Sequence, residues 1–170
     1  MSQAQFITTM FRYKAWANDE MLNAVQRFDE ERHAPERHAA IYLLNHTYIV
    51  DRIFADHLCG RTHGYLAATE RENPPLDKLS HDIRRSDAWY VNYTTGLTGE
   101  ELAESIDFTF TDGALGRMSR AEMLVHALMH GGYHRGAIGR IMAQLSIRPP
   151  GDVLTGYLHK TEGPARRRML

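Results

Sequence analysis

The stretch Ser119–Ser146, SRAEMLVHALMHGGYHRGAIGRIMAQLS, decides the fold of this chain and carries most of its candidate chemistry. Ser119 and Glu122 form a capping-box pattern, in which each side chain accepts a hydrogen bond from the other residue's backbone N–H at the start of a helix. Apolar residues then keep helical spacing, at Leu124, Leu128, Ile138, Ile141, Met142 and Leu145. The stretch therefore predicts one long amphipathic helix.

The same helix carries three histidines, His126, His130 and His134, at intervals of four residues. This spacing puts neighbouring imidazoles on one face, where a pair can hold one divalent ion at about 2.0–2.1 Å per zinc–nitrogen bond. A catalytic metal site usually has three protein ligands, so another segment must supply one. Gly131 and Gly132 each cost about 1 kcal/mol in a helix, which indicates that a backbone or a ligand comes close. On the residues alone, hydrogen-bonded or solvated histidines remain an equally good interpretation.

Upstream of this helix, the chain shows three more amphipathic stretches. Ser2 and Gln5 make a second capping-box pattern, and Pro35 suits the first turn of a helix that Gly60 would end. The stretches cover residues 2–28, 35–59 and 76–96. The charged residues of the third stretch, including Asp87, are expected to form a solvated surface.

The connections between the helices differ greatly in length. Residues 61–75 are predicted to be a loop, and residues 105–118 a short hairpin that turns at Asp112-Gly113. The fold class expected is all-α: a four-helix bundle with long crossovers and a hairpin-like loop before the fourth helix. Residues 1–160 are expected to form this single domain, with one or two helical turns at 153–159, and residues 161–170 a frayed tail.

A third metal ligand is sought among the histidines of the second helix. His46 lies near its middle and on the flank of its apolar stripe, so its imidazole should face inward and need a partner. His57 shares that face but lies about 16 Å further along the axis, so the two cannot bind one ion. The histidines in polar surroundings are expected to be solvated: His33, His38, His63 and His81.

Composition sets limits on function. The 170 residues carry a formal net charge of −1, which gives no electrostatic reason to expect nucleic acid as a partner. No run approaches the roughly 18 apolar residues of a membrane span, so no membrane partner is expected. With one cysteine, Cys59, and no apolar leader pattern, the protein is expected to be cytoplasmic.

Three segments together resemble the DinB and YfiT-like family of metal-dependent helix bundles. Tyr13, Trp16, Ala17 and Asn18 match its opening Y-x-x-W-A-N pattern, and His46 stands where the family has its first metal ligand. The segment 126–136, HALMHGGYHRG, resembles its H-x-x-x-H-x-x-x-H-R-G pattern. The family often continues with a glutamine, whereas this chain has Ala137.

The resemblance implies that His46, His130 and His134 bind one divalent ion, zinc or nickel, with solvent in the remaining positions. It implies a homodimer and a small-molecule substrate, and points to a thiol-dependent transferase or isomerase, or a hydrolase, that uses a low-molecular-weight thiol. The alternative is a non-catalytic, stress-related bundle whose metal is structural or whose site is vestigial.

Five further residues are candidates for the surroundings of the metal or for substrate contact. His126 is expected beside the ligands, where it would orient one of them. Asp51 and Tyr133 are candidates for proton transfer, although packing roles are at least as good an interpretation. Arg135 would bind a substrate carboxylate, a dimer partner or a side chain of the first helix. Trp16 belongs to the opening pattern, and packing is its default role.

Overall fold

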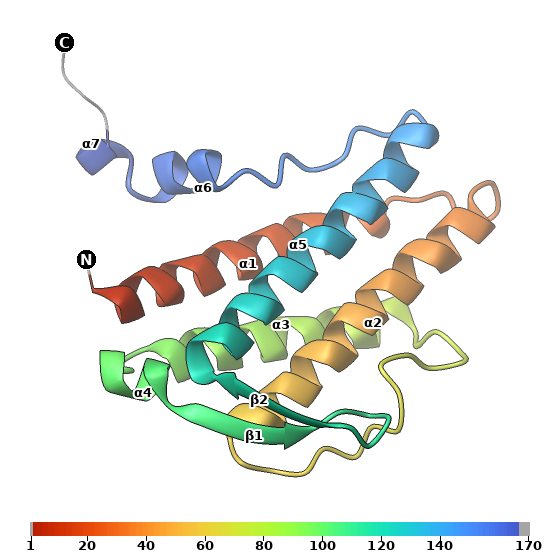
Figure 1. Ribbon diagram of the computed structural model, residues 1–170. Coiled ribbons are helices and arrows are strands. Elements are labelled where there is room, and N and C mark those ends of the chain that lie inside the picture. The colour runs from red at the N-terminus through yellow and green to blue at the C-terminus, as the bar shows by residue number, and fades with distance from the viewer. Residues whose placement is uncertain (1, 167–170) are drawn as a thin grey trace.

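The computed structural model describes residues 2–166 and confirms a helical bundle with a hairpin before its last long helix (Figure 1). Four long helices make the bundle: α1 (Gln3–Val25), α2 (Ala34–Leu58), α3 (Leu76–Thr94) and α5 (Arg120–Gln144). In Figure 1, α2 and α5 lie in front of α1 and α3. None of the described helices combines the length and apolar character that a membrane crossing requires.

The helix ends follow the local sequence signals. At Ser2 and at Ser119, both hydrogen bonds of a capping box are present, with Gln5 and Glu122 as the respective partners. Beyond the end of α2, Gly60 adopts a φ of +65°, a left-handed backbone conformation that glycine takes without steric penalty.

The connection from α3 to α5 contains a short helix and the hairpin. Strands β1 (Ser105–Thr109) and β2 (Leu115–Ser119) pair antiparallel, and the turn places Gly113 at a φ of +88°. The short helix α4 (Gly99–Ala103) was not expected, although Thr98 and Glu101 form a capping box there. The hairpin leads directly into α5 and so sets where that helix begins.

The C-terminal segment returns along the bundle toward the N-terminus (Figure 1). It forms α6 (Leu154–Thr161), in the region where one or two helical turns were expected, and α7 (Gly163–Arg166). Residues 161–166 of the tail that was expected to be frayed thus complete α6 and form α7, and residues 167–170 lie outside the described residues.

The core consists of two apolar clusters with a polar layer between them. One cluster contains Met21, Leu44, Ile83 and Met142, and the other contains Phe11, Val50, Tyr90 and Ala127 among their members. Between these levels, each long helix contributes buried polar residues: Lys14 and Asn18 from α1, Asp51 from α2, Asp87 from α3 and Arg135 from α5.

Lys14 is the centre of this polar layer. Its ammonium group donates hydrogen bonds to Asp51 Oδ2 at 2.6 Å and Asp87 Oδ1 at 2.8 Å, and its side chain is 1% exposed. Both bonds keep the buried charge compensated, and the two carboxylates raise the pKa of Lys14 against the opposing effect of burial. Three helices are thereby joined through one side chain.

Asp87 is an exception to the solvated charged face expected on α3, where Lys78, Arg84 and Arg85 are exposed. The side chain is buried, and besides Lys14 it accepts hydrogen bonds from Asn18 Nδ2 at 3.1 and 2.9 Å. The expectation was wrong for Asp87 because its partner cation, Lys14, lies on α1. The spacing of residues along α3 gives no sign of that partner.

Gly131 on α5 is fitted to this polar layer. A Cβ at this position would lie 3.2 Å from Arg135 Nη1 and 3.3 Å from Lys14 Cε. Both neighbours are held by hydrogen bonds to acceptors on other helices, so neither moves aside easily. The glycine therefore permits close packing of α5 on the charged groups.

Gly131→Ala is expected to destabilise the protein by about 1–3 kcal/mol, as in other overpacked cores, despite the helix propensity of alanine. Gly136→Ala is the matched control, because a Cβ there meets nothing within 4 Å, and it is expected to stabilise by up to about 1 kcal/mol. Urea unfolding measures both. Equal stabilisation by the two substitutions would contradict the packing described for Gly131.

Candidate metal centre

Three histidines from two helices meet in the middle of the bundle. His130 Nε2 lies 3.1 Å from His46 Nε2 and 3.1 Å from His134 Nε2. One ring nitrogen from each residue lies within 4.8 Å of the others, and all three side chains are half-buried. The structure thus brings together His46, His130 and His134, the three residues selected from the sequence.

The orientation of His46 is fixed by the loop that follows α2. Its Nδ1 lies 2.8 Å from the carbonyl oxygen of Ala68. A carbonyl can only accept, so Nδ1 carries the proton and the neutral ring presents the Nε2 lone pair to His130 and His134. Asn45 holds the same loop by donating to Glu70 Oε2 at 3.2 Å. The loop thus sets the tautomer of His46.

Burial keeps the imidazoles on α5 neutral. Desolvation, with the neighbouring His134 and His46, lowers the pKa of His130 to about 3. Desolvation and His46 also lower the pKa of His134. A neutral ring has a free lone pair at neutral pH, which is the form that binds a metal ion.

This arrangement fits one divalent metal ion. Two nitrogens at about 2.0–2.1 Å from a tetrahedral ion lie about 3.3 Å apart, close to the observed 3.1 Å separations. A carbonyl on the second nitrogen of a ligating histidine, as Ala68 provides for His46, is the usual support of such ligands. Nδ1 of His130 and of His134 is buried and has no hydrogen-bond partner among residues 2–166, so their tautomers are not fixed in this way.

The depressed pKa of His130 predicts how the stability of the metal-free protein depends on pH. Below about pH 6.5, the unfolded chain takes up a proton on this residue, whereas the folded chain stays neutral down to about pH 3. The free energy of unfolding should therefore fall as the pH decreases through this range. Asp51 acts in the opposite sense, because burial raises its pKa to about 6 and its folded form gains the proton first.

The two contributions separate by comparison of variants. In the presence of a chelator, the loss of unfolding free energy between pH 7.5 and pH 5 is expected to be smaller in His130→Gln than in the unchanged protein. Urea titrations at the two pH values give this difference. Equal slopes would show that His130 is not held neutral by the fold.

Two of the five further candidates lie beside the three histidines. The ring of His126 stacks between Phe54, at 4.5 Å between centroids, and His130, at 5.6 Å. Tyr133 packs the edge of its ring on His134 at 5.2 Å and is 76% exposed. His126 therefore supports the ring of His130, and Tyr133 stands at the solvent rim.

Asp51 and Arg135 make their hydrogen bonds within the polar layer and not to the histidines. Asp51 accepts from Lys14, and its other carboxylate oxygen is buried without a partner among the described residues. Arg135 donates to Asn18 Oδ1 at 2.9 Å and to Asp152 Oδ2 at 2.9 Å. Of the three partners considered for Arg135, the structure shows the side chain of the first helix.

Trp16 packs against the C-terminal segment, and no contact joins it to the three histidines in the described residues. Its ring packs on Tyr157 of α6 at 5.6 Å and on Tyr13 at 6.0 Å. Tyr13 also donates to Asp152 Oδ1 at 2.5 Å, and this bond and burial raise its pKa to about 12. The opening aromatic pattern thus anchors the C-terminal segment on α1.

Sequence reasoning missed Ala68 and Lys14. A backbone carbonyl carries no residue-specific signal, so the support of His46 could not be found from the sequence. The sequence does contain a signal for Lys14, because this residue lies on the apolar face of the first helix between Phe11 and Ala17. A lysine at a buried position requires paired carboxylates.

Comparisons with known proteins show to which family the chain belongs. A family model described as the DinB family matches residues 1–168. Protein DinB of Bacillus subtilis (strain 168) is 22% identical over 171 residues, which cover 94% of this chain and 98% of that protein. No solved structure matches the chain significantly. Because the family model spans nearly the whole sequence, the chain belongs to the DinB family.

Proposed function

We propose that this protein is a metal-dependent enzyme in which His46, His130 and His134 hold one divalent ion, zinc or nickel. The observation that carries the proposal is the convergence of three Nε2 atoms, with His130 at 3.1 Å from each of the other two. Neutral imidazoles suit zinc and nickel, whereas magnesium and calcium prefer oxygen ligands.

The number of ligands favours a catalytic over a structural role. Among the described residues, the group contains three ligands, and structural zinc sites usually have four. The three histidines are also half-buried, so solvent and small molecules can approach. The three histidines would hold such an ion with free coordination positions, where it would supply Lewis-acid chemistry to a thiol, water or substrate oxygen.

The side chains around the histidines define what the protein itself contributes. Ala68 fixes the tautomer of His46, and Phe54 with His126 supports the ring of His130. Asp51 and Arg135 are occupied in the polar layer, which leaves Tyr133 and His126 as the groups that line the approach.

For the reaction, we propose a thiol-dependent transfer or isomerisation of a small molecule, with hydrolysis as the neighbouring possibility. The support is the family membership and the set of three neutral ligands, because uncharged imidazoles leave the ion its full charge to stabilise a thiolate. A low-molecular-weight thiol is the cosubstrate that this chemistry requires.

Cobalt substitution tests the proposal without knowledge of the substrate. Glutathione added to the Co²⁺-loaded protein is expected to produce an absorption band from thiolate bound to cobalt. The band should be absent in His130→Ala. A loaded protein whose spectrum does not change with glutathione, cysteine or another small thiol would contradict the thiol-dependent proposal.

The rival function is a non-catalytic bundle that uses its ion for stability. Circular dichroism of the metal-free protein separates the two: an enzyme site added to a complete core keeps its helix content, whereas a structural site loses it. The two apolar clusters described above favour retention of helix content without metal.

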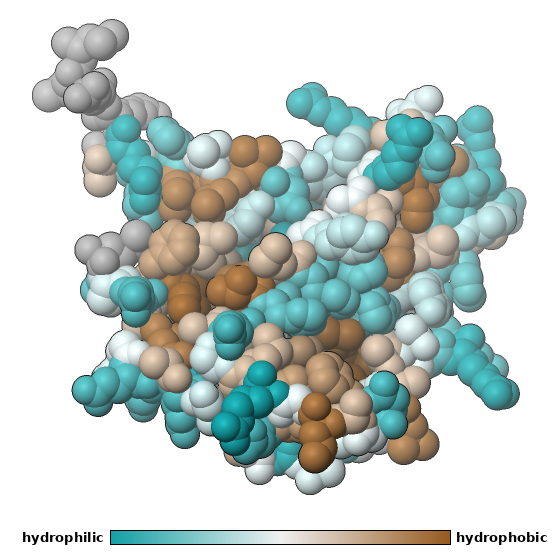
Figure 2. Space-filling view, in the orientation of Figure 1, coloured by the Kyte–Doolittle hydropathy of each residue, from teal (hydrophilic) through white to brown (hydrophobic). Residues whose placement is uncertain are grey.

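We also propose a homodimer, with α5 at its interface. Val125, Met129 and Tyr133 recur every four residues on the outside of α5 and are 42%, 71% and 76% exposed. In Figure 2, which views the side on which α2 and α5 lie in front, hydrophobic surface is interspersed with hydrophilic residues. A second copy would cover the exposed apolar side chains of α5.

Met129→Glu is expected to convert the dimer to a monomer, because it would place a carboxylate in the middle of that interface. Light scattering after size exclusion should give half the mass of the unchanged protein. A monomeric unchanged protein at tens of micromolar would contradict the dimer.

A further inference from the structure

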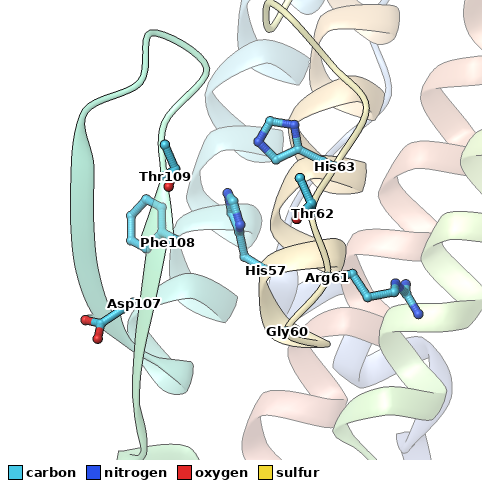
Figure 3. Close-up of a pocket in the computed structure, with 8 residues that line it drawn as sticks. All are labelled: His57, Gly60, Arg61, Thr62, His63, Asp107, Phe108 and Thr109. Carbon is cyan, nitrogen blue, oxygen red and sulfur yellow. The ribbon is translucent and has the colours of Figure 1, made fainter.

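A further pair of histidines, His57 and His63, lines a cavity at the carboxyl end of α2 (Figure 3). The cavity has a volume of about 230 Å³ and lies between the end of α2, the loop that follows it and strand β1. His57 comes from the last turn of α2 and His63 from the loop. Figure 3 shows the ring of His57 between Phe108 of β1 and the loop that carries His63.

The two rings have the geometry of the pairs in the metal centre. Their centroids are 5.0 Å apart and their planes make an angle of 78°. The three pairs among His46, His130 and His134 have centroid distances of 4.5–4.9 Å and angles of 66–80°. His57 and His63 are therefore packed edge to face, at a ring separation close to that of the histidines in the metal centre.

Neither histidine ring makes a hydrogen bond to another group among residues 2–166. His57 is only 8% exposed, yet neither of its nitrogens makes a hydrogen bond within residues 2–166. Nδ1 of His63 is buried and also has no partner among those residues. Nδ1 of His63 therefore lacks the partner that a buried polar atom normally has, and the nitrogens of His57 are open to the cavity that this residue lines. His63 was expected to be solvated; it is half-buried, because the end of α2 and β1 line the same cavity beside it.

The charges around the cavity favour a cation. Arg61 is bound to Asp56 by two hydrogen bonds, and Asp107 is paired with Arg117, so neither supplies a free charge to the cavity. In Figure 3, the charged ends of Arg61 and Asp107 point away from the two rings. His57 stands at the carboxyl end of α2, where the helix dipole is negative.

The remaining lining groups allow an ion to keep water. Thr62 and Thr109 bring hydroxyl groups to the wall, and a water molecule occupies about 30 Å³, so the cavity has room for an ion with several waters. Burial and the neighbouring His63 lower the pKa of His57, which keeps its lone pair available at neutral pH.

We propose that His57 and His63 form a second, weaker site for a divalent transition-metal ion, with two imidazole ligands and solvent in the other positions. Two imidazoles bind copper most tightly among the divalent first-row metals, with nickel and zinc weaker. The site is independent of the metal centre and of the reaction proposed for it.

Calorimetric titration with Cu²⁺ tests the second site in a full-length chain that carries His130→Ala and His134→Ala. This chain, which lacks two ligands of the metal centre, is expected to bind about one copper ion at the second site. Adding His57→Gln and His63→Gln should weaken this binding more than about tenfold, since loss of a ligand costs at least as much as loss of its support. The proposal would be overturned if the two glutamine substitutions left the copper affinity unchanged. It would also be overturned if the chain with only His130→Ala and His134→Ala bound no copper.

Two control measurements test whether copper binds to other histidines of the chain instead. His38→Gln and His81→Gln in the same background replace two exposed histidines and are expected to leave the affinity unchanged. In NMR spectra, sub-stoichiometric Cu²⁺ should broaden the amide signals of residues 57–63 and 107–109 first. First broadening around His46 and His126 would place the copper elsewhere and refute the second site.

Discussion

Lys14→Met is expected to destabilise the folded protein by about 3–5 kcal/mol, the usual cost of leaving a buried charge without its partner. The methionine keeps most of the volume of the lysine but cannot donate to Asp51 or Asp87. Both carboxylates are 4% exposed, so water cannot replace the lost hydrogen bonds. Urea or thermal unfolding measures the loss.

A pH series distinguishes lost charge compensation from a packing defect. Without Lys14, the pKa of Asp51 must rise further, because burial already raises it to about 6 in the presence of the ammonium group. A group whose pKa is raised in the folded state contributes less to the stability of the protein as the pH increases. The destabilisation should therefore be larger at pH 8 than at pH 5.

Lys78→Met serves as the matched control. Lys78 pairs with Asp82 at 2.9 Å on the surface of α3, where water and ions screen the pair. Its substitution is expected to change the stability little at either pH. A loss as large as that of Lys14→Met would mean that burial of the ion pair is not what matters.

The second large effect is on metal affinity. His46→Ala is expected to abolish binding of divalent ions at the metal centre, and His130→Ala should do the same. His130 is in contact with both other ligands, and His46 is the one contributed by α2. Two histidines four residues apart on α5 would remain in His46→Ala, and such a pair binds an ion only weakly in competition with a chelator.

His126→Ala is the informative comparison, because it removes an imidazole from the same helix face without removing a ligand. It is expected to weaken binding about tenfold at most, through the lost support of the His130 ring. Titration with Zn²⁺ against a chromophoric chelator gives all three affinities. Equal metal affinity in His46→Ala and the unchanged protein would refute the three-ligand assignment.

The helices were predictable because their signals are local. Capping residues and helical spacing placed the last long helix at 119–146, and it is observed at Arg120–Gln144. The residues of the metal centre could be selected because helix geometry fixes the separation of His130 and His134, and the family resemblance added His46.

The polar layer and the second histidine pair depend on contacts between distant segments. Asp87 and Lys14 are 73 residues apart, and nothing in the pattern of either helix pairs them. His63 lies at the cavity that it shares with His57 only because the hairpin folds back against the end of α2. Such placements follow from packing of whole elements, which local periodicity does not specify.

The central claim is that three histidines hold one catalytic metal ion, and elemental analysis of the protein purified without a histidine tag tests it most directly. The His130→Ala, His134→Ala double variant, purified in parallel, is the control. About one zinc or nickel ion per chain in the unchanged protein and none in the double variant is the expected result. An unchanged protein that contains no metal, even after incubation with excess divalent ions, would contradict the claim.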